Sequence, residues 1–172
     1  MHYQYPYQNN RMPYGNERKK VQGECAPSHT MPSFHKDCGK EPFVVNIEEV
    51  TKQNTTFRTA LWTGKYLQVT VMCIPVGESI GLEIHTDVDQ FIRIEEGCAL
   101  VQMGEDRKYV ECQRKVDNQY AIVIPAGTWH NIINTGNVPL KVYSIYAPPQ
   151  HSKGTVHCTK KDAQQEERHI EE

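Results

Sequence analysis

The chain has 172 residues, a length that fits one folded domain with room for polar ends. Its 19 Lys and Arg residues nearly balance 21 Asp and Glu residues. The formal charge of -2 argues against a nucleic-acid-binding protein, which would carry a basic stripe. No run is long and apolar enough to cross a membrane, so we expect neither a nucleic acid nor a membrane among its partners.

Residues 1–41 are predicted to form a polar arm outside the folded domain. The first twenty residues are rich in Tyr, Pro, Asn and Gln and show no apolar period. Such a segment cannot bury enough surface to offset its chain entropy, so we expect it to be disordered or to order only by docking on a neighbour. The N-terminus shows no charged start followed by an apolar stretch, which predicts a cytoplasmic protein without a secretory signal.

The arm also contains a cluster of residue types that bind zinc, namely Cys25, His29, His35 and Cys38. Their intervals do not match a familiar zinc finger, so we interpret the cluster as a coincidence in a polar arm. In a cytoplasmic protein all six cysteines are expected to be thiols rather than disulfides.

Residues 42–150 are predicted to form an all-β barrel. Side chains alternate in the stretch KYLQVTVMCIPVGE, and short apolar runs punctuated by Gly, Pro, Asn and Asp follow it without a helical period. The predicted strands include FVVNI, GLEIHT, QFIRIEEG, CALVQMG, KYVECQ, YAIVIPAG, HNIINTG and LKVYSIYAP. Seven or more such strands indicate a sandwich or barrel, with GEDRK, from Gly104 to Lys108, as a hairpin loop. Cys73, Cys98 and Cys112 fall within strand runs and are expected to be small core residues.

Residues 151–172 are predicted to be a short tail whose charged end, KKDAQQEERHIEE, forms a frayed helix or stays irregular. His151 and His157 follow the last predicted barrel strand. We expect surface or loop positions for both, although they could reach the barrel mouth.

Two spaced motifs within the barrel point to a metal site. In the first, Gly77, Glu83, His85, Gln90 and Gly97 stand six, two, five and seven positions apart. In the second, Gln119 is followed by Pro125, Gly127, His130 and Asn134.

These two segments resemble the paired motifs of the cupin superfamily over roughly residues Phe43 to Pro149. Relative to the family pattern, Glu83 stands in place of the first His, Gln90 in place of the Glu, and Gln119 in place of the leading Gly of the second motif. The resemblance implies a double-stranded β-helix, or jelly roll, and a homodimer. It also implies one divalent ion held by Glu83, His85, Gln90 and His130.

The residues support this interpretation independently of the family. Side chains two apart on a strand share a face, so Glu83 and His85 are expected to point the same way. The turn TDVD returns the chain at Gln90, and the turn at Gly127 places His130 on another strand. Two His and one carboxylate suit a divalent transition metal, here zinc, iron, manganese or nickel. Gln90, a neutral ligand, either completes the set or hydrogen-bonds a bound water, and Asp87 and Asp89 are interpreted as turn residues.

Three classes of function remain open at this point, because one fold hosts many chemistries. The ligand set resembles that of zinc-dependent phosphomannose isomerases, which favours isomerisation of a sugar or sugar phosphate held in the barrel. No phosphate-binding pair is evident, since Arg93 is predicted to face away from Gln90 and Lys65 and Lys141 are only candidates. The first alternative is an iron- or manganese-dependent dioxygenase with a facial triad. The second is a non-enzymatic ligand-binding protein, or a spore-coat protein, which the Tyr-rich arm weakly resembles.

Overall fold

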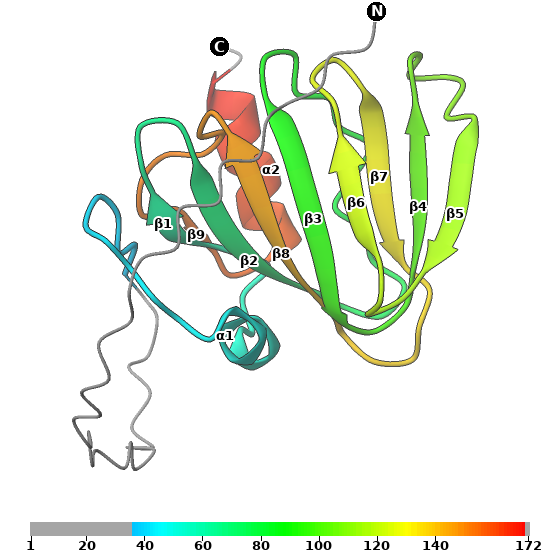
Figure 1. Ribbon diagram of the computed structural model, residues 1–172. Helices are drawn as coiled ribbons and strands as arrows, with labels where there is room; N and C mark the ends of the chain where they lie inside the picture. The colour runs from blue at the N-terminus through cyan, green and yellow to red at the C-terminus, as the bar shows by residue number, and fades with distance from the viewer. Residues whose placement is uncertain (1–35, 171–172) are drawn as a thin grey trace, which may run out of the picture. The chain divides into compact units, whose positions relative to one another are not determined.

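The computed structural model describes residues 36–170, which form two antiparallel sheets and two helices (Figure 1). One sheet has six strands in the order β6-β3-β8-β2-β1-β9, and the other has three in the order β5-β4-β7. The elements are α1 (Ile47–Gln53), β1 (Arg58–Thr63), β2 (Gln68–Ile74), β3 (Asp89–Glu96), β4 (Ala99–Gly104), β5 (Cys112–Val116), β6 (Ala121–Ile124), β7 (Trp129–Asn134), β8 (Leu140–Ala147), β9 (Val156–His157) and α2 (Lys160–Ile170). The predicted all-β jelly roll is confirmed.

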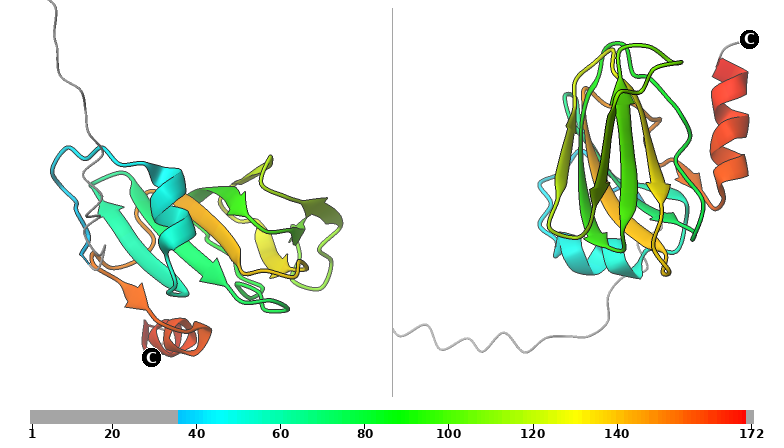
Figure 2. Two further views of the ribbon diagram at one scale, coloured as in Figure 1. Left: turned by 90° about the horizontal axis from the view of Figure 1, so that it is seen from below. Right: turned by 90° about the vertical axis from the view of Figure 1, so that its right-hand side faces the viewer.

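The two sheets enclose an apolar core at one end of the barrel. Figure 2 shows the two layers in its right-hand view. Inward-facing residues of both sheets meet there because side chains alternate along each strand. The core includes Met72, Ile74, Ile92, Ile94, Ala99, Val101, Ile132, Leu140 and Val142, each exposed by 2% or less.

The same inward-facing rows become polar toward the other end of the barrel. Strand β8 pairs Ser144 with Thr70 and Tyr146 with Gln68 on β2, and Tyr146 also pairs with Gln90 on β3. All five side chains are buried, at 3% exposure or less. Burying polar groups without hydrogen bonds is costly, so polar side chains in the interior favour a binding site for a ligand or metal at this end of the barrel.

A second apolar cluster covers the outer face of the six-stranded sheet. Val50 of α1 packs there with Leu61 of β1 and Val71 of β2. Helix α1 begins after Asn46, whose side-chain oxygen accepts a hydrogen bond from the Glu49 amide at 3.2 Å. This N-cap explains why the segment is helical, although no helix is predicted from the sequence between residues 42 and 150.

Several predicted elements require correction. The run GLEIHT is not a strand; it is a loop that Glu83 joins to β7 through an isolated bridge to His130. FVVNI lies outside the strands, and β1 was not predicted. The core assignment is wrong for Cys98 and Cys112, which are exposed, whereas Cys73 is half-buried.

The fold extends beyond the predicted barrel limits at both ends. Asp37, within the predicted arm, is buried and accepts hydrogen bonds from the amides of Thr63 and Gly154 at 3.0 Å each. Strand β9 pairs with β1 beyond residue 150, and α2 follows it. Among the described residues, neither helix has the length and apolar character needed to span a bilayer.

Candidate metal centre and pocket

Glu83 and His130 are brought together by a two-way backbone bridge. The Glu83 amide donates to the His130 carbonyl at 3.0 Å, and the His130 amide donates to the Glu83 carbonyl at 2.9 Å. Residues directly opposite in an antiparallel bridge project their side chains to the same side. The loop that carries Glu83 and His85 therefore delivers both toward His130 on β7, as the sequence predicted.

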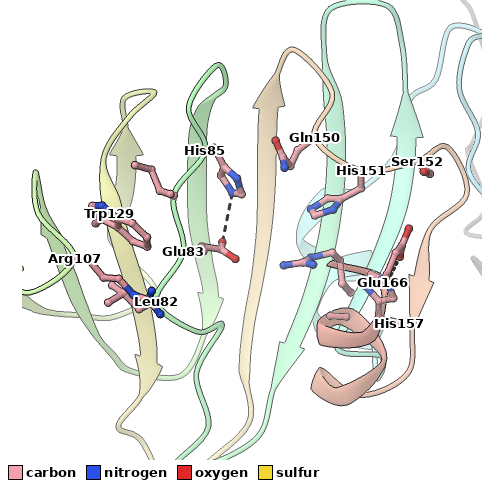
Figure 3. Close-up of a pocket in the computed structure, with 13 residues that line it drawn as sticks. Leu82, Glu83, His85, Arg107, Trp129, Gln150, His151, Ser152, His157 and Glu166 are labelled. Carbon is pink, nitrogen blue, oxygen red and sulfur yellow. Dashed lines mark hydrogen bonds and ion pairs between the residues drawn. The ribbon is translucent and has the colours of Figure 1, made fainter. Parts of the chain in front are cut away.

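The three side chains converge closely enough to share one ion. Glu83 Oε1 lies 3.3 Å from His130 Nε2 and 3.5 Å from His85 Nε2. The ligand atoms of the three residues all lie within 4.8 Å of one another. Figure 3 shows Glu83 and His85 directed toward each other beside the pocket.

The turn before β7 fixes the orientation of His130. Gly127 has a φ of 78°, which favours glycine, and its amide donates to the His85 carbonyl at 2.8 Å. Asp89 stabilises the same turn by accepting from the Ala126 amide at 2.9 Å. His130 Nδ1 lies 2.9 Å from the Thr128 carbonyl, which can only accept, so Nδ1 carries a proton and Nε2 is the ring nitrogen that faces Glu83.

Burial opposes the ionisation of Glu83, but the close approach of the His130 and His85 rings to its carboxylate and the positive charge of Arg58 outweigh it. These interactions hold the pKa of Glu83 well below its usual range, so the site contains a carboxylate at neutral pH. A carboxylate with two imidazoles is a donor set suited to zinc, iron, manganese or nickel.

The unsatisfied polar atoms of the site also fit a metal ion. Among the described residues, His85 Nε2, His130 Nε2 and Gln90 Oε1 are buried without a geometrically sound hydrogen bond. Buried polar atoms ordinarily have partners, and a cation would supply one to all three. The arrangement brings Glu83, His85 and His130 together; Gln90 is 3% exposed on an inward-facing position of β3, and its role as a fourth ligand stays a prediction.

A cavity of about 520 Å³ opens beside these ligands. Figure 3 shows Glu83 and His85 on one side of it and His151, His157 and Glu166 on the other. The lining also includes Arg58, Leu82, Ile84, Arg107, Trp129, Gln150, Ser152 and Ala163. His151 lies in the loop after β8, as expected, and also lines the pocket. The expected surface or loop position of His157 is wrong, because it is buried on β9 and lines the pocket.

His151 is held in place by a buried glutamine. Gln68 Oε1 accepts from the His151 amide at 2.9 Å, and Gln68 Nε2 donates to the His151 carbonyl at 2.8 Å. The Tyr146 ring packs edge-on between the His151 and His85 rings, with centroid separations of 5.1 and 5.8 Å. Burial, together with the charge of Arg58, lowers the pKa of His151 to about 3, so its imidazole is neutral near pH 7.

The opposite wall combines β1, β9 and α2. Arg58 of β1 is 2% exposed and stands directly across from His157 of β9. His157 Nε2 forms a short contact with Glu166 Oε2 of α2. The helix predicted as one possibility for the charged C-terminal segment forms as α2, but Arg58 was missed as part of this wall because a buried arginine matches no motif.

The remaining candidate residues lie elsewhere. Lys65 sits over the exposed Tyr66 ring, and Lys141 Nζ donates to the Asn54 carbonyl. Neither lines the pocket, and Arg93 faces outward from β3 near Glu95, as expected. Asp87 is an exposed loop residue, as expected, whereas Asp89 is not a turn residue but the exposed first residue of β3. Of the four Cys and His residues interpreted as a coincidence in the arm, Cys25, His29 and His35 lie outside the described residues, and Cys38 contacts the Lys36 carbonyl.

Comparison with known proteins agrees with this fold. The family model described as Cupin domain matches residues 70–146. The chain is 65% identical over 128 residues to the uncharacterized protein YrkC of Bacillus subtilis (strain 168), covering 74% of this chain and 69% of that protein. It is 40% identical over 115 residues to the uncharacterized protein L612 of Acanthamoeba polyphaga mimivirus, covering 66% and 70% respectively.

Solved structures give the same result. The crystal structure of BH2720 from Bacillus halodurans matches with a TM-score of 0.75 and 63% identity, over 76% of this chain and 98% of that chain. TT1209 from Thermus thermophilus matches at 17% identity with a TM-score of 0.52, over 61% of this chain and 96% of that chain, which indicates a shared fold alone. Together with the jelly roll and its two motifs, these matches establish that the chain belongs to the cupin superfamily.

Proposed function

We propose that this protein is a metal-dependent enzyme that interconverts the aldose and ketose forms of a sugar or sugar phosphate. The observation that carries the proposal is the position of the three ligands. Glu83 and His85 line a polar cavity of about 520 Å³, and His130 lies against both. A cavity of this size accommodates a small polar molecule.

Glu83, His85 and His130 would hold the ion, with Gln90 as a fourth, neutral ligand. A divalent ion there would act as a Lewis acid on a carbonyl or hydroxyl oxygen of the sugar. The carboxylate lowers the net charge of the site, and the hydrogen bond from His130 Nδ1 keeps that imidazole aligned.

Isomerisation also requires a group that moves a proton, and His151 has the right placement. Its Nε2 is buried, and no described residue hydrogen-bonds it. Because the imidazole is neutral, Nε2 can take the proton from the carbon beside the carbonyl. The C–H electron pair then becomes the C=C bond of an enediolate, and the carbonyl pair moves to oxygen.

The proton then returns to the former carbonyl carbon, while the hydroxyl proton passes from one oxygen to the other. This sequence needs no oxidant or reductant. The Gln68 clamp and the Tyr146 contact keep the imidazole in one position, which favours repeated transfer at the same two carbons.

The test is conversion of mannose 6-phosphate to fructose 6-phosphate by zinc-, manganese- or iron-reconstituted protein. We expect turnover by the wild type, and incorporation of solvent deuterium at the exchanging carbons. His151→Gln should lower kcat by about a hundredfold while retaining the metal. Turnover that is equal in wild type and His151→Gln would contradict the assigned proton transfer.

A second candidate is a dioxygenase, favoured by the composition of the cluster itself. Two histidines and one carboxylate form the ligand set of non-haem Fe(II) oxygenases, which keep positions open for substrate and dioxygen. Consumption of oxygen by the iron protein with a diphenol or thiol, without isomerisation of any sugar phosphate, would select this alternative.

A further inference from the structure

A continuous chain of hydrogen bonds joins Asp37 to the backbone of His151. The fully buried Gln68 side chain, which holds the amide and the carbonyl of His151, also donates from Nε2 to Thr63 Oγ1 at 2.9 Å. Thr63 Oγ1 in turn donates to Asp37 Oδ2. We call the three side chains of Asp37, Thr63 and Gln68 the latch.

The direction of each hydrogen bond in the latch follows from the His151 backbone. The His151 carbonyl can only accept and its amide can only donate, which fixes the orientation of the Gln68 side-chain amide. The second proton on Gln68 Nε2 is directed at Thr63 Oγ1, so the Thr63 hydroxyl accepts there and gives its own proton to another acceptor. A carboxylate has no proton to donate, so Asp37 ends the chain without a conflict between donors.

The carboxylate of Asp37 uses its full capacity to accept hydrogen bonds. Oδ1 accepts from the amides of Gly39 and Thr63 at 2.9 and 3.0 Å, and Oδ2 accepts from the Thr63 hydroxyl and from the Gly154 amide. Burial opposes the ionisation of Asp37, but these hydrogen bonds outweigh it and lower the pKa of the carboxyl group. The latch therefore ends in a buried carboxylate at neutral pH.

The latch holds the loop that carries His151 at two points. Gln68 binds the backbone of His151, and Asp37 binds the amide of Gly154 at 3.0 Å. Figure 3 shows the His151 ring directed from this loop toward the side of the pocket that carries the metal ligands. Since no described residue hydrogen-bonds the buried Nε2 of His151, the position of its backbone and the contact with Tyr146 determine where Nε2 points.

We propose that Asp37 is a positioning residue, which through the latch keeps the His151 imidazole at a fixed place in the pocket. The inference rests on the proposed function for what His151 does there, which is to move a proton between two carbon atoms of the substrate. Asp37 does not itself line the cavity. Because a misplacement of about 1 Å can lower a rate about a hundredfold, a side chain outside the pocket can nevertheless control kcat.

Two substitutions break the latch at different bonds. Asp37→Asn replaces one acceptor oxygen with a donor, which then faces either the Gly154 amide or the amides of Gly39 and Thr63. Thr63→Val removes the hydroxyl at similar volume and leaves Gln68 Nε2 without one of its acceptors. Thr63→Ser retains the hydroxyl and is the conservative variant.

The first measurement is amide hydrogen exchange, followed by NMR in the full-length, zinc-loaded protein. The His151 amide donates to Gln68 and does not touch Asp37, so its exchange rate reports an effect that the latch transmits. Relative to the amides of β3 and β8, which establish that each variant is folded, this rate should rise at least about tenfold in Asp37→Asn and Thr63→Val. Thr63→Ser should stay close to wild type, and so should the matched control Asp117→Asn, in the exposed turn between β5 and β6.

The second measurement is isomerisation of mannose 6-phosphate by the same zinc-loaded proteins, at a temperature at which all of them are folded. Asp37→Asn and Thr63→Val should lower kcat by about tenfold, with KM and zinc content close to wild type, because the metal ligands keep their places. Thr63→Ser and Asp117→Asn should retain the wild-type kcat. A side chain that only stabilises the fold would lower the Tm without this selective loss of kcat.

The two measurements separate this inference from the proposed function. Unchanged His151 amide exchange, or an unchanged kcat, in folded Asp37→Asn and Thr63→Val overturns the positioning role. If Asp37→Asn does not fold, Thr63→Val and Thr63→Ser carry the comparison. Faster His151 exchange in both variants of a protein that isomerises no sugar phosphate supports the latch and contradicts the isomerase. Isomerisation that does not depend on Asp37 and Thr63 supports the isomerase and overturns the inference.

Discussion

The stability of the metal-free protein in mild acid should depend on His151. Burial, with the charge of Arg58, lowers the pKa of His151 to about 3 in the folded state, whereas an unfolded histidine titrates near its ordinary value of 6.5. Below pH 6.5 the unfolded chain therefore binds a proton that the folded chain does not. While the unfolded chain binds one proton more than the folded chain, the free energy of unfolding falls by about 1.4 kcal/mol for each pH unit below 6.5. The burial of His151 therefore lowers the free energy of unfolding by about 3 kcal/mol at pH 4.5.

The assay is urea unfolding of chelator-treated wild type and His151→Gln between pH 8 and pH 4.5. Glutamine does not titrate, so the wild type should lose about 3 kcal/mol more than the variant over this range. The lowered pKa of Glu83 also stabilises the folded protein above pH 4.5. Because Glu83 is present in both proteins, its contribution cancels when the free energies of unfolding of wild type and His151→Gln are subtracted. Parallel stability curves would refute the reasoning, because His151 would then be as easily protonated in the folded state as in the unfolded chain.

Three further expectations concern the ligands, the core and the assembly. Glu83→His should keep the fold and a metal but shift the preference toward copper or nickel, and identical manganese, zinc and nickel affinities in both proteins would remove Glu83 from the site. Ile132→Ala, at a residue with 0% exposure, should cost about 2–5 kcal/mol in urea unfolding, and a change below about 1 kcal/mol would contradict the core assignment. We also predict a two-fold homodimer with the Tyr-rich arm on the partner, which light scattering checks and a monomer mass would exclude.

The convergence of Glu83, His85 and His130 was predictable because its signal is local. Glu83, His85 and His130 lie in two short motifs whose spacing places Glu83 and His85 on one face and brings His130 onto a neighbouring strand. A backbone bridge between Glu83 and His130 then completes the arrangement. Alternation also predicted that Arg93 faces away from Gln90, because that relation depends on strand geometry alone.

The far wall of the pocket was not predictable in this way, because it is built from long-range contacts. His151 reaches the cavity only because Gln68, 83 positions earlier, holds its backbone on both sides. His157 reaches it because β9 pairs with β1 at Arg58. Helix α1 was missed for a different reason: its seven residues are too few to show a periodicity, and its main signal is the cap at Asn46.

The central claim is that Glu83, His85 and His130 hold one divalent ion. Elemental analysis of protein purified without added metal tests it most directly, with the wild type compared to a His85→Ala, His130→Ala double variant. We predict about one zinc, iron, manganese or nickel ion per wild-type chain and a large loss in the variant, together with a lower Tm, because an ion that binds only the folded state stabilises it. Full metal occupancy in a folded double variant would contradict the claim.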